Sequence, residues 1–237
     1  MSEEARGFEI NPGWEIRAYT VGREQEPVLV IDKVLAEPQA LVEAAAAANF
    51  GAVKPGGNFY PGLRTPAPKP YVRNLHAALR PVIAAAFGLP SEGMIKMSSA
   101  LSLATLKPQE LAPAQRLPHF DTADGGQIAV LHYLCGPEHG GTAFYRHRAT
   151  GFETVTPGRL AAYVAALEAE TAARPPAQDY IRGDTELFEQ IGRVEAAFDR
   201  VAVYRSHLLH AGDMGPSPAF SSDARHGRLT ANTFLFF

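Results

Sequence analysis

The chain has 237 residues, with 22 lysines and arginines against 25 aspartates and glutamates, and 46% of its residues are hydrophobic. The balanced charge, without a basic stripe, predicts no nucleic-acid partner, and no apolar run approaches the roughly 18 residues of a spanning helix, which predicts no membrane partner. The single cysteine, Cys135, cannot form an internal disulfide, and the acidic start of the chain lacks signal-peptide features. We therefore expect a cytoplasmic protein in which Cys135 is a small core residue.

The N-terminal third predicts one strand and several helices. Residues 27–35 are rich in valine and isoleucine, which is typical of a strand, and residues 38–50 combine a proline in the first turn with strong helix formers. Residues 53–70 are dense in proline and glycine, so we expect a loop there that closes over a binding site. Two helical segments should follow, one on each side of Pro81.

From residue 94 onward the pattern changes to short alternating segments separated by Gly/Pro turns. Such segments lie at residues 96–106, 127–136, 141–147, 201–210 and 228–237, and they predict strands of a sandwich or barrel of the jelly-roll kind. Residues 156–199 interrupt this pattern with two apolar stripes at helical spacing, so we expect an inserted helical hairpin. The hairpin could cover one face of the sheet or act as a lid over a site.

The predicted fold class is therefore mainly β with flanking helices (α+β). We expect one domain over residues 1–237, built on a jelly-roll core, also called a double-stranded β-helix. Residues 1–93 would supply a strand and supporting helices, residues 94–155 and 200–237 the jelly-roll strands, and residues 156–199 the helical insertion.

The segment LPHFDTADGG holds a histidine and an aspartate two residues apart, His119 and Asp121. On a strand, alternating side chains point to opposite faces, so these two should point the same way. An imidazole and a carboxylate on one face suit Fe(II), Mn(II) or Zn(II), but a third ligand has to come from elsewhere. The segment VAVYRSHLLHAG offers His207 and His210, and their odd spacing means that only one of them should face the metal.

The closing strand holds Arg228 and Thr230 on one face by the same alternation. An arginine fork can bind a carboxylate through two parallel hydrogen bonds, and a nearby hydroxyl can add a third. This strand therefore predicts a carboxylate-binding site.

A His-x-Asp pair, a distant histidine and an Arg-x-Thr on the closing strand together resemble the Fe(II)/2-oxoglutarate-dependent oxygenase superfamily. The segments AVLHYLCGPEHGGTAFY and VYRSHLLHAG also resemble that superfamily, in particular its prolyl-hydroxylase-like branch, and the chain looks most like a bacterial branch of it. The resemblance covers residues 94–237, apart from the helical insertion. It favours His210 over His207 as the third ligand.

The resemblance implies an Fe(II) site formed by His119, Asp121 and His210, with 2-oxoglutarate and O2 as cosubstrates. It implies that Arg228 and Thr230 bind the distal carboxylate of 2-oxoglutarate. Tyr133 would supply a further hydroxyl to the cosubstrate. The expected activity is hydroxylation of an unidentified small molecule or peptide side chain.

One departure from the superfamily pattern concerns the arginine, which usually lies closer to the last histidine. Here the Gly/Pro/Ser-rich residues 212–227 separate His210 from Arg228, and we interpret them as a loop insertion. Arg225 is nearer to the histidine, but it precedes the turn at Gly227, so the strand pattern favours Arg228.

Substrate contacts are predicted from three further residues, Tyr60 and Arg64 in the Pro/Gly-rich loop and Arg146 after Gly141. Three other functions stay open. The chain could be a cupin-like metal enzyme that does not use 2-oxoglutarate, a non-catalytic jelly-roll binding module, or an oxygenase fold that has lost turnover. The sequence does not predict the oligomeric state.

Overall fold

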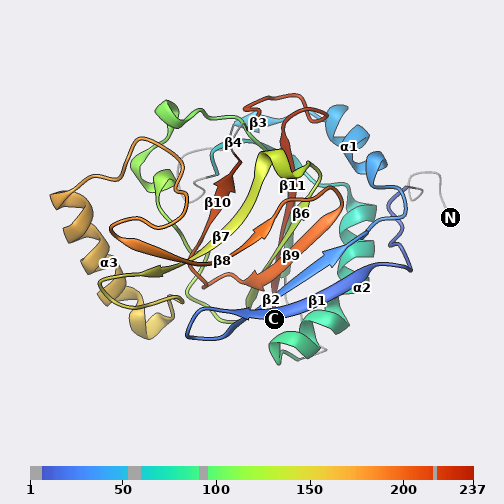
Figure 1. The fold of residues 1–237 in the computed structure, drawn as a ribbon. Coiled ribbons are helices and arrows are strands. Elements are labelled where there is room, and N and C mark those ends of the chain that lie inside the picture. The colour runs from blue at the N-terminus through green and yellow to red at the C-terminus, as the bar shows by residue number, and fades with distance from the viewer. Residues whose placement is uncertain (1–6, 53–59, 91–95, 216–217) are drawn as a thin grey trace.

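A computed structural model describes residues 7–52, 60–90, 96–215 and 218–237. Within these residues the strands form two antiparallel sheets, one of eight strands in the order β1-β2-β9-β6-β11-β5-β4-β3 and one of three in the order β10-β7-β8 (Figure 1). The two sheets and their connections make a double-stranded β-helix, as the sequence predicted. The large sheet consists of β1 (Glu15–Val21), β2 (Glu26–Asp32), β3 (Gly51–Ala52), β4 (Gly62–Pro66), β5 (Lys96–Ala104), β6 (Gln127–Tyr133), β9 (Arg200–Arg205) and β11 (Arg228–Phe236), and the small sheet of β7 (Gly140–His147), β8 (Phe188–Glu195) and β10 (His210–Met214).

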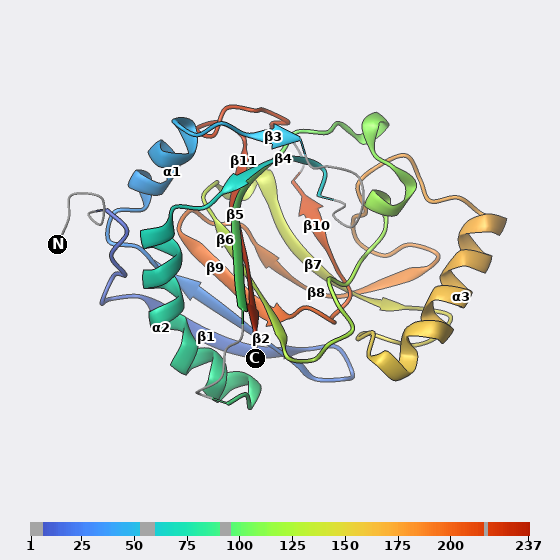
Figure 2. The ribbon, with the colours of Figure 1, turned by 180° about the vertical axis from the view of Figure 1, so that it is seen from behind.

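Three α-helices flank the sheets: α1 (Pro38–Ala46), α2 (Lys69–Phe87) and α3 (Pro157–Ala173). The first two cover the outer face of the large sheet, and α3 lies on the opposite side of the molecule (Figures 1 and 2). The largest apolar cluster joins α1 and α2 to the large sheet through side chains such as Leu41, Leu75, Leu103, Val203 and Leu229. This burial is the main source of the fold's stability.

A second apolar cluster fills the space between the two sheets, with Val28, Tyr133, Phe144 and Tyr204 among its members. Cys135 belongs to this cluster and is buried, which confirms its expected place in the core. A third cluster joins the small sheet to α3 through Tyr145, Tyr163 and Phe188. The helix α3 therefore covers the small sheet.

The predicted helical hairpin is half wrong, because only its first arm is a helix. The second arm is the strand β8, which pairs antiparallel with β7 and has a register shift beside Phe144 and Tyr145. Leu187, Phe188, Ile191, Val194 and Phe198 repeat at helical spacing, but pairing with β7 overrides that local pattern. Gly192 was the one residue in this segment that argued against a helix. A Cβ at this position would lie 2.7 Å from Cγ1 of Val21, so glycine permits the close approach of β1.

The N-terminal third differs from the prediction in three places. The strand β1 was missed: six of its seven residues are exposed, including the apolar Ile16, and only Val21 is buried. The predicted loop over residues 53–70 contains β4 and the start of α2, and its residues 53–59 lie outside the described residues. The two helical segments around Pro81 are one helix, which continues through the proline with one hydrogen bond fewer.

In the part of the chain that the structure describes, no helix is both long enough and apolar enough to cross a membrane.

Candidate metal centre

The segment that carries His119 and Asp121 runs along the free edge of β10. His119 forms an isolated antiparallel bridge with His210, in which each backbone N–H donates to the other residue's carbonyl at 2.8 Å. The backbone N–H of Asp121 donates to the carbonyl of Ser206, also at 2.8 Å. The His-x-Asp pair therefore lies on a short bridged segment rather than on a regular strand, and backbone bonds fix its position beside His210.

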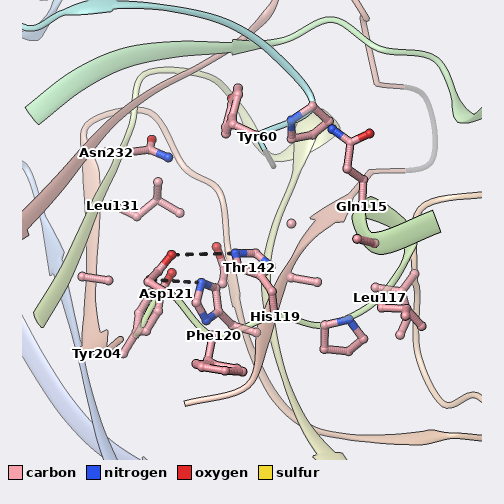
Figure 3. A pocket seen from close by; sticks show the side chains of 18 of the residues that line it. Tyr60, Gln115, Leu117, His119, Phe120, Asp121, Leu131, Thr142, Tyr204 and Asn232 are labelled. Atoms are coloured by element: carbon pink, nitrogen blue, oxygen red, sulfur yellow. Dashed lines mark ion pairs between the residues drawn. The ribbon is translucent and has the colours of Figure 1, made fainter. Parts of the chain in front are cut away.

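The side chains of His119, Asp121 and His210 converge on one point. Nε2 of His119 lies 3.9 Å from Oδ1 of Asp121, and Nε2 of His210 lies 3.7 Å from Oδ2 of the same carboxylate (Figure 3). The two imidazole rings have centroids 4.3 Å apart, and the three potential ligand atoms all lie within 4.8 Å of one another. Two imidazoles and one carboxylate in this arrangement fit a divalent transition metal with open coordination positions.

The surroundings of the three candidate ligands affect their protonation in different directions. Nδ1 of His210 donates to the carbonyl of Leu208 at 2.8 Å, which leaves the lone pair on Nε2, the nitrogen that faces Asp121. The surrounding protein, together with His210, lowers the pKa of His119, although 52% of its side chain remains exposed. The His119 imidazole is therefore neutral near pH 7, which is the form that binds metals. Desolvation raises the pKa of Asp121, and His210 and a hydrogen bond with Ser206 oppose that shift.

The candidate metal centre opens into a cavity of about 630 Å³, a size typical of small-molecule sites. The cavity lies between the sheets and extends to α3. Figure 3 shows Tyr60 and Asn232 on one side of the candidate ligands and Phe120 on the other. Further lining residues are Arg64, Gln115, Leu131, Thr142, Tyr204 and Arg228.

Arg228 is almost completely buried at the start of β11, with 4% of its surface exposed. Its guanidinium donates to two backbone carbonyls, that of His139 at 3.3 Å and that of Gly141 at 2.6 Å. No carboxylate among the described residues forms an ion pair with it. A buried arginine without a counter-ion is costly unless an anion binds there.

Thr230 lies beside Arg228, as the strand alternation predicted, and its hydroxyl donates to Oδ1 of Asn232 at 2.7 Å. Tyr60 lies close to Thr230 and Arg228, and the positive charge of Arg228 lowers the pKa of the Tyr60 hydroxyl against the larger effect of burial. Tyr60 therefore belongs to the arginine end of the cavity. Tyr133 is fully buried, and its hydroxyl forms a 2.6 Å hydrogen bond with the hydroxyl of Thr142, which lines the cavity.

The two other predicted substrate residues lie in different surroundings. Arg64 lines the cavity, from β4 rather than from a loop. Arg146 lies outside the cavity, and its guanidinium donates to Glu153 at 2.7 Å and to Glu189 at 2.6 Å. Arg146 therefore lies away from the other predicted site residues, with its donors directed to these two carboxylates.

Two other candidates from the sequence lie away from the centre. Nε2 of His207 is 3.5 Å from Oε1 of Glu26, and this histidine is not part of the candidate metal centre. Arg225 is exposed and forms an ion pair with Glu43 at 2.5 Å. Neither residue lines the cavity.

Sequence reasoning missed several cavity residues. Asn232 and Phe234 could have been found, since they continue the alternation of Arg228 and Thr230 along β11. Tyr163, Val164 and Leu167 of α3 also line the cavity, and no local pattern distinguishes them from ordinary core residues.

Comparisons with known proteins gave one family match and several remote structural likenesses. A model of a family of unknown function, DUF6445, matches residues 12–235. A search of curated proteins gave no significant match.

Three of the similar solved structures are described as metal- or 2-oxoglutarate-related proteins. One is SnoK, a non-heme alpha-ketoglutarate-dependent carbocyclase from nogalamycin biosynthesis (14% identity, 100% of this chain and 84% of that chain, TM-score 0.48). The others are EctD from S. alaskensis with bound Fe (15%, 96% and 85%, TM-score 0.47) and HygX from Streptomyces hygroscopicus with nickel and 2-oxoglutarate (16%, 90% and 86%, TM-score 0.43). These likenesses are remote, so the chemistry of this chain has to come from its own residues.

Proposed function

Because the chain belongs to a family of unknown function, DUF6445, we propose its activity from its own site: an Fe(II)- and 2-oxoglutarate-dependent oxygenase, acting as a hydroxylase. One observation carries this proposal. A His-Asp-His cluster and a buried arginine that lacks a carboxylate partner among the described residues open into the same cavity. A cupin-like enzyme that does not use 2-oxoglutarate, or a binding module, has no need for that arginine.

In this proposal His119, Asp121 and His210 hold Fe(II), which leaves coordination positions open. Two imidazoles and one carboxylate are the donor set of non-heme iron oxygenases. Bound Fe(II) would supply the redox chemistry that activates O2 and decarboxylates 2-oxoglutarate. One oxygen atom of O2 enters succinate, the other converts a substrate C–H into C–OH, and CO2 is released, so the atoms and electrons balance.

The arginine end of the cavity would bind the distal carboxylate of 2-oxoglutarate. Arg228 supplies the charge, and the Thr230 and Tyr60 hydroxyls lie close enough to each other to bond the same anion. The backbone carbonyls of His139 and Gly141 fix the guanidinium before the anion arrives. Tyr133 would not contact 2-oxoglutarate itself. Its hydroxyl would instead position Thr142 through the hydrogen bond between them.

Anaerobic titration of the purified protein with Fe(II) and then 2-oxoglutarate tests this proposal. We expect the weak visible metal-to-ligand charge-transfer band of the ternary complex in the wild type. His210→Ala should abolish the band, and Arg228→Ala should shift its appearance to much higher 2-oxoglutarate concentrations.

Two matched controls should behave like the wild type. His207→Ala removes a neighbouring buried histidine outside the cluster, and Arg225→Ala removes an exposed arginine near Arg228. Metal uptake without the band would point instead to an enzyme that does not use 2-oxoglutarate. No metal uptake would favour the non-catalytic binding module.

A further inference from the structure

The cavity contains a second arginine, Arg64 on β4, which forms no ion pair with the described part of the chain. Its Nε donates to the hydroxyl of Ser102 at 3.1 Å, and its guanidinium carbon lies 5.6 Å from the centre of the Tyr60 ring. Within the described ranges, no carboxylate forms an ion pair with Arg64 and no acceptor besides Ser102 bonds it. The terminal Nη groups are therefore available to a ligand.

The register of the sheet directs Arg64 toward the candidate metal centre. Arg64 pairs with Ser102 on β5, and Ser102 pairs with Thr230 on β11, so all three side chains lie on the same face of the sheet as Arg228. The Arg64 side chain also lines the same cavity as His119, Asp121 and His210. Arg64 is thus the arginine that remains for a second anion when 2-oxoglutarate occupies Arg228.

The far part of the cavity is apolar. It is formed by residues 117–120, by α3 and by the segment that follows α3, with Leu117, Phe120, Tyr163, Val164, Leu167 and Ile181 as lining residues. Val164 lines the cavity although 38% of its surface is exposed. An apolar side chain that is open to solvent at the edge of a cavity can gain contacts from an apolar ligand.

We propose that the primary substrate is a carboxylic acid with an apolar body. Its carboxylate would bind the Arg64 fork, and its apolar body would lie along the wall formed by α3 and residues 117–120. One arginine fork matches the single charge and planar geometry of a carboxylate, whereas a phosphate dianion would keep an unmatched charge. This inference rests on the proposed oxygenase activity and names the substrate class for the same site.

Calorimetric titration of anaerobic protein loaded with Fe(II) and 2-oxoglutarate tests the substrate class. The probes are 4-phenylbutyrate, 4-phenylbutyramide and phenethyl phosphate. We expect the wild type to bind the acid at least about tenfold more tightly than the amide, because a charge-assisted hydrogen bond contributes that much. Arg64→Gln should make the two affinities equal without changing the 2-oxoglutarate titration, and Arg64→Lys should keep part of the preference.

The apolar wall has its own matched pair of variants on α3. Val164 and Leu160 are similarly exposed, at 38% and 37%, but only Val164 lines the cavity. Val164→Asn should weaken both the acid and the amide several-fold, whereas Leu160→Asn should leave them unchanged. Equal effects of the two variants would overturn the assignment of the wall.

The remaining outcomes separate this inference from the proposed function. Failure of the charge-transfer band to form would overturn the oxygenase proposal itself. A normal band overturns only the substrate class if the acid and amide bind equally, if neither binds at millimolar concentration, or if the phosphate binds more tightly than the acid. Loss of 2-oxoglutarate binding in Arg64→Gln would assign Arg64 to the cosubstrate and overturn its role here.

Discussion

Arg146 and Arg228 are both nearly inaccessible to solvent, with 7% and 4% of their surface exposed, but their partners differ. Arg146 binds the carboxylates of Glu153 and Glu189, and Glu153 also accepts hydrogen bonds from the backbone N–H groups of Arg23 and Glu24. Arg228 binds only backbone carbonyls among the described residues. The first arginine completes its interactions within the chain and joins β7 to the β1–β2 turn. The second leaves its charge uncompensated, which is typical of a binding site.

The largest effect expected from this comparison is on stability. Arg146→Met leaves the fully buried carboxylate of Glu153 without its cation, so the free energy of unfolding should fall by about 3 kcal/mol. The value lies at the lower end for a broken buried pair because the other partner, Glu189, is partly exposed. Urea denaturation measures the loss, and a change below about 1 kcal/mol would contradict the structural role.

The opposite pattern is expected at the other arginine. Arg228→Met should weaken 2-oxoglutarate binding by roughly 30- to 100-fold, or about 2–3 kcal/mol, because it removes a charge-assisted carboxylate contact. Its unfolding free energy should change by only about 1 kcal/mol, since loss of two carbonyl contacts is offset by loss of an unpaired buried charge. Titration of the charge-transfer band and urea denaturation give the two values. Arg146→Met serves as the control. If Arg146→Met lost as much affinity for 2-oxoglutarate as Arg228→Met, the proposed difference between a structural and a binding arginine would be wrong.

A smaller loss of stability is expected at Glu189, the second carboxylate that binds Arg146. Glu189→Gln keeps a hydrogen-bond acceptor for Arg146 but removes one charge at a partly exposed position. The expected loss is about 0.5 kcal/mol, as for other solvent-screened pairs. Raising the salt concentration during denaturation should reduce the difference from wild type further, and a salt-independent loss would argue against a charge effect.

The smallest expected effect is on the Cys135 thiol. Burial raises its pKa to about 11, and the positive charge of Arg228 acts in the opposite direction by stabilising the thiolate. Arg228→Met should therefore raise the Cys135 pKa further, whereas Arg146→Met should not. The 13Cβ chemical shift of this single cysteine, followed against pH, measures the change.

The sequence predicted the parts of the fold and site that depend on short spacing. The alternation in residues 228–237 gave β11 and put Arg228 and Thr230 on one face, and the His-x-Asp pair marked a segment that does lie beside His210. Both results follow from the two-residue period of extended chains. Pairing with distant segments was not predictable in this way, and β8 was therefore interpreted as a helix from its own apolar spacing.

The partners of individual arginines were equally inaccessible to sequence reasoning. Arg146 and Arg64 were both predicted to contact substrate, yet only Arg64 lines the cavity. The difference comes from Glu153 and Glu189, which approach Arg146 from the loop after β7 and from β8. A local pattern contains no information about such tertiary contacts.

The reciprocal backbone bonds between His119 and His210 link the candidate metal centre to the order in which the chain folds. The two residues are far apart in sequence, and the bridge can form only after β10 has reached the segment around His119. An ion held by both side chains would therefore tie these segments together and slow their separation. Hydrogen exchange should then report the ion directly: the amide protons of His119 and His210 would be lost together, and more slowly when the ion is bound.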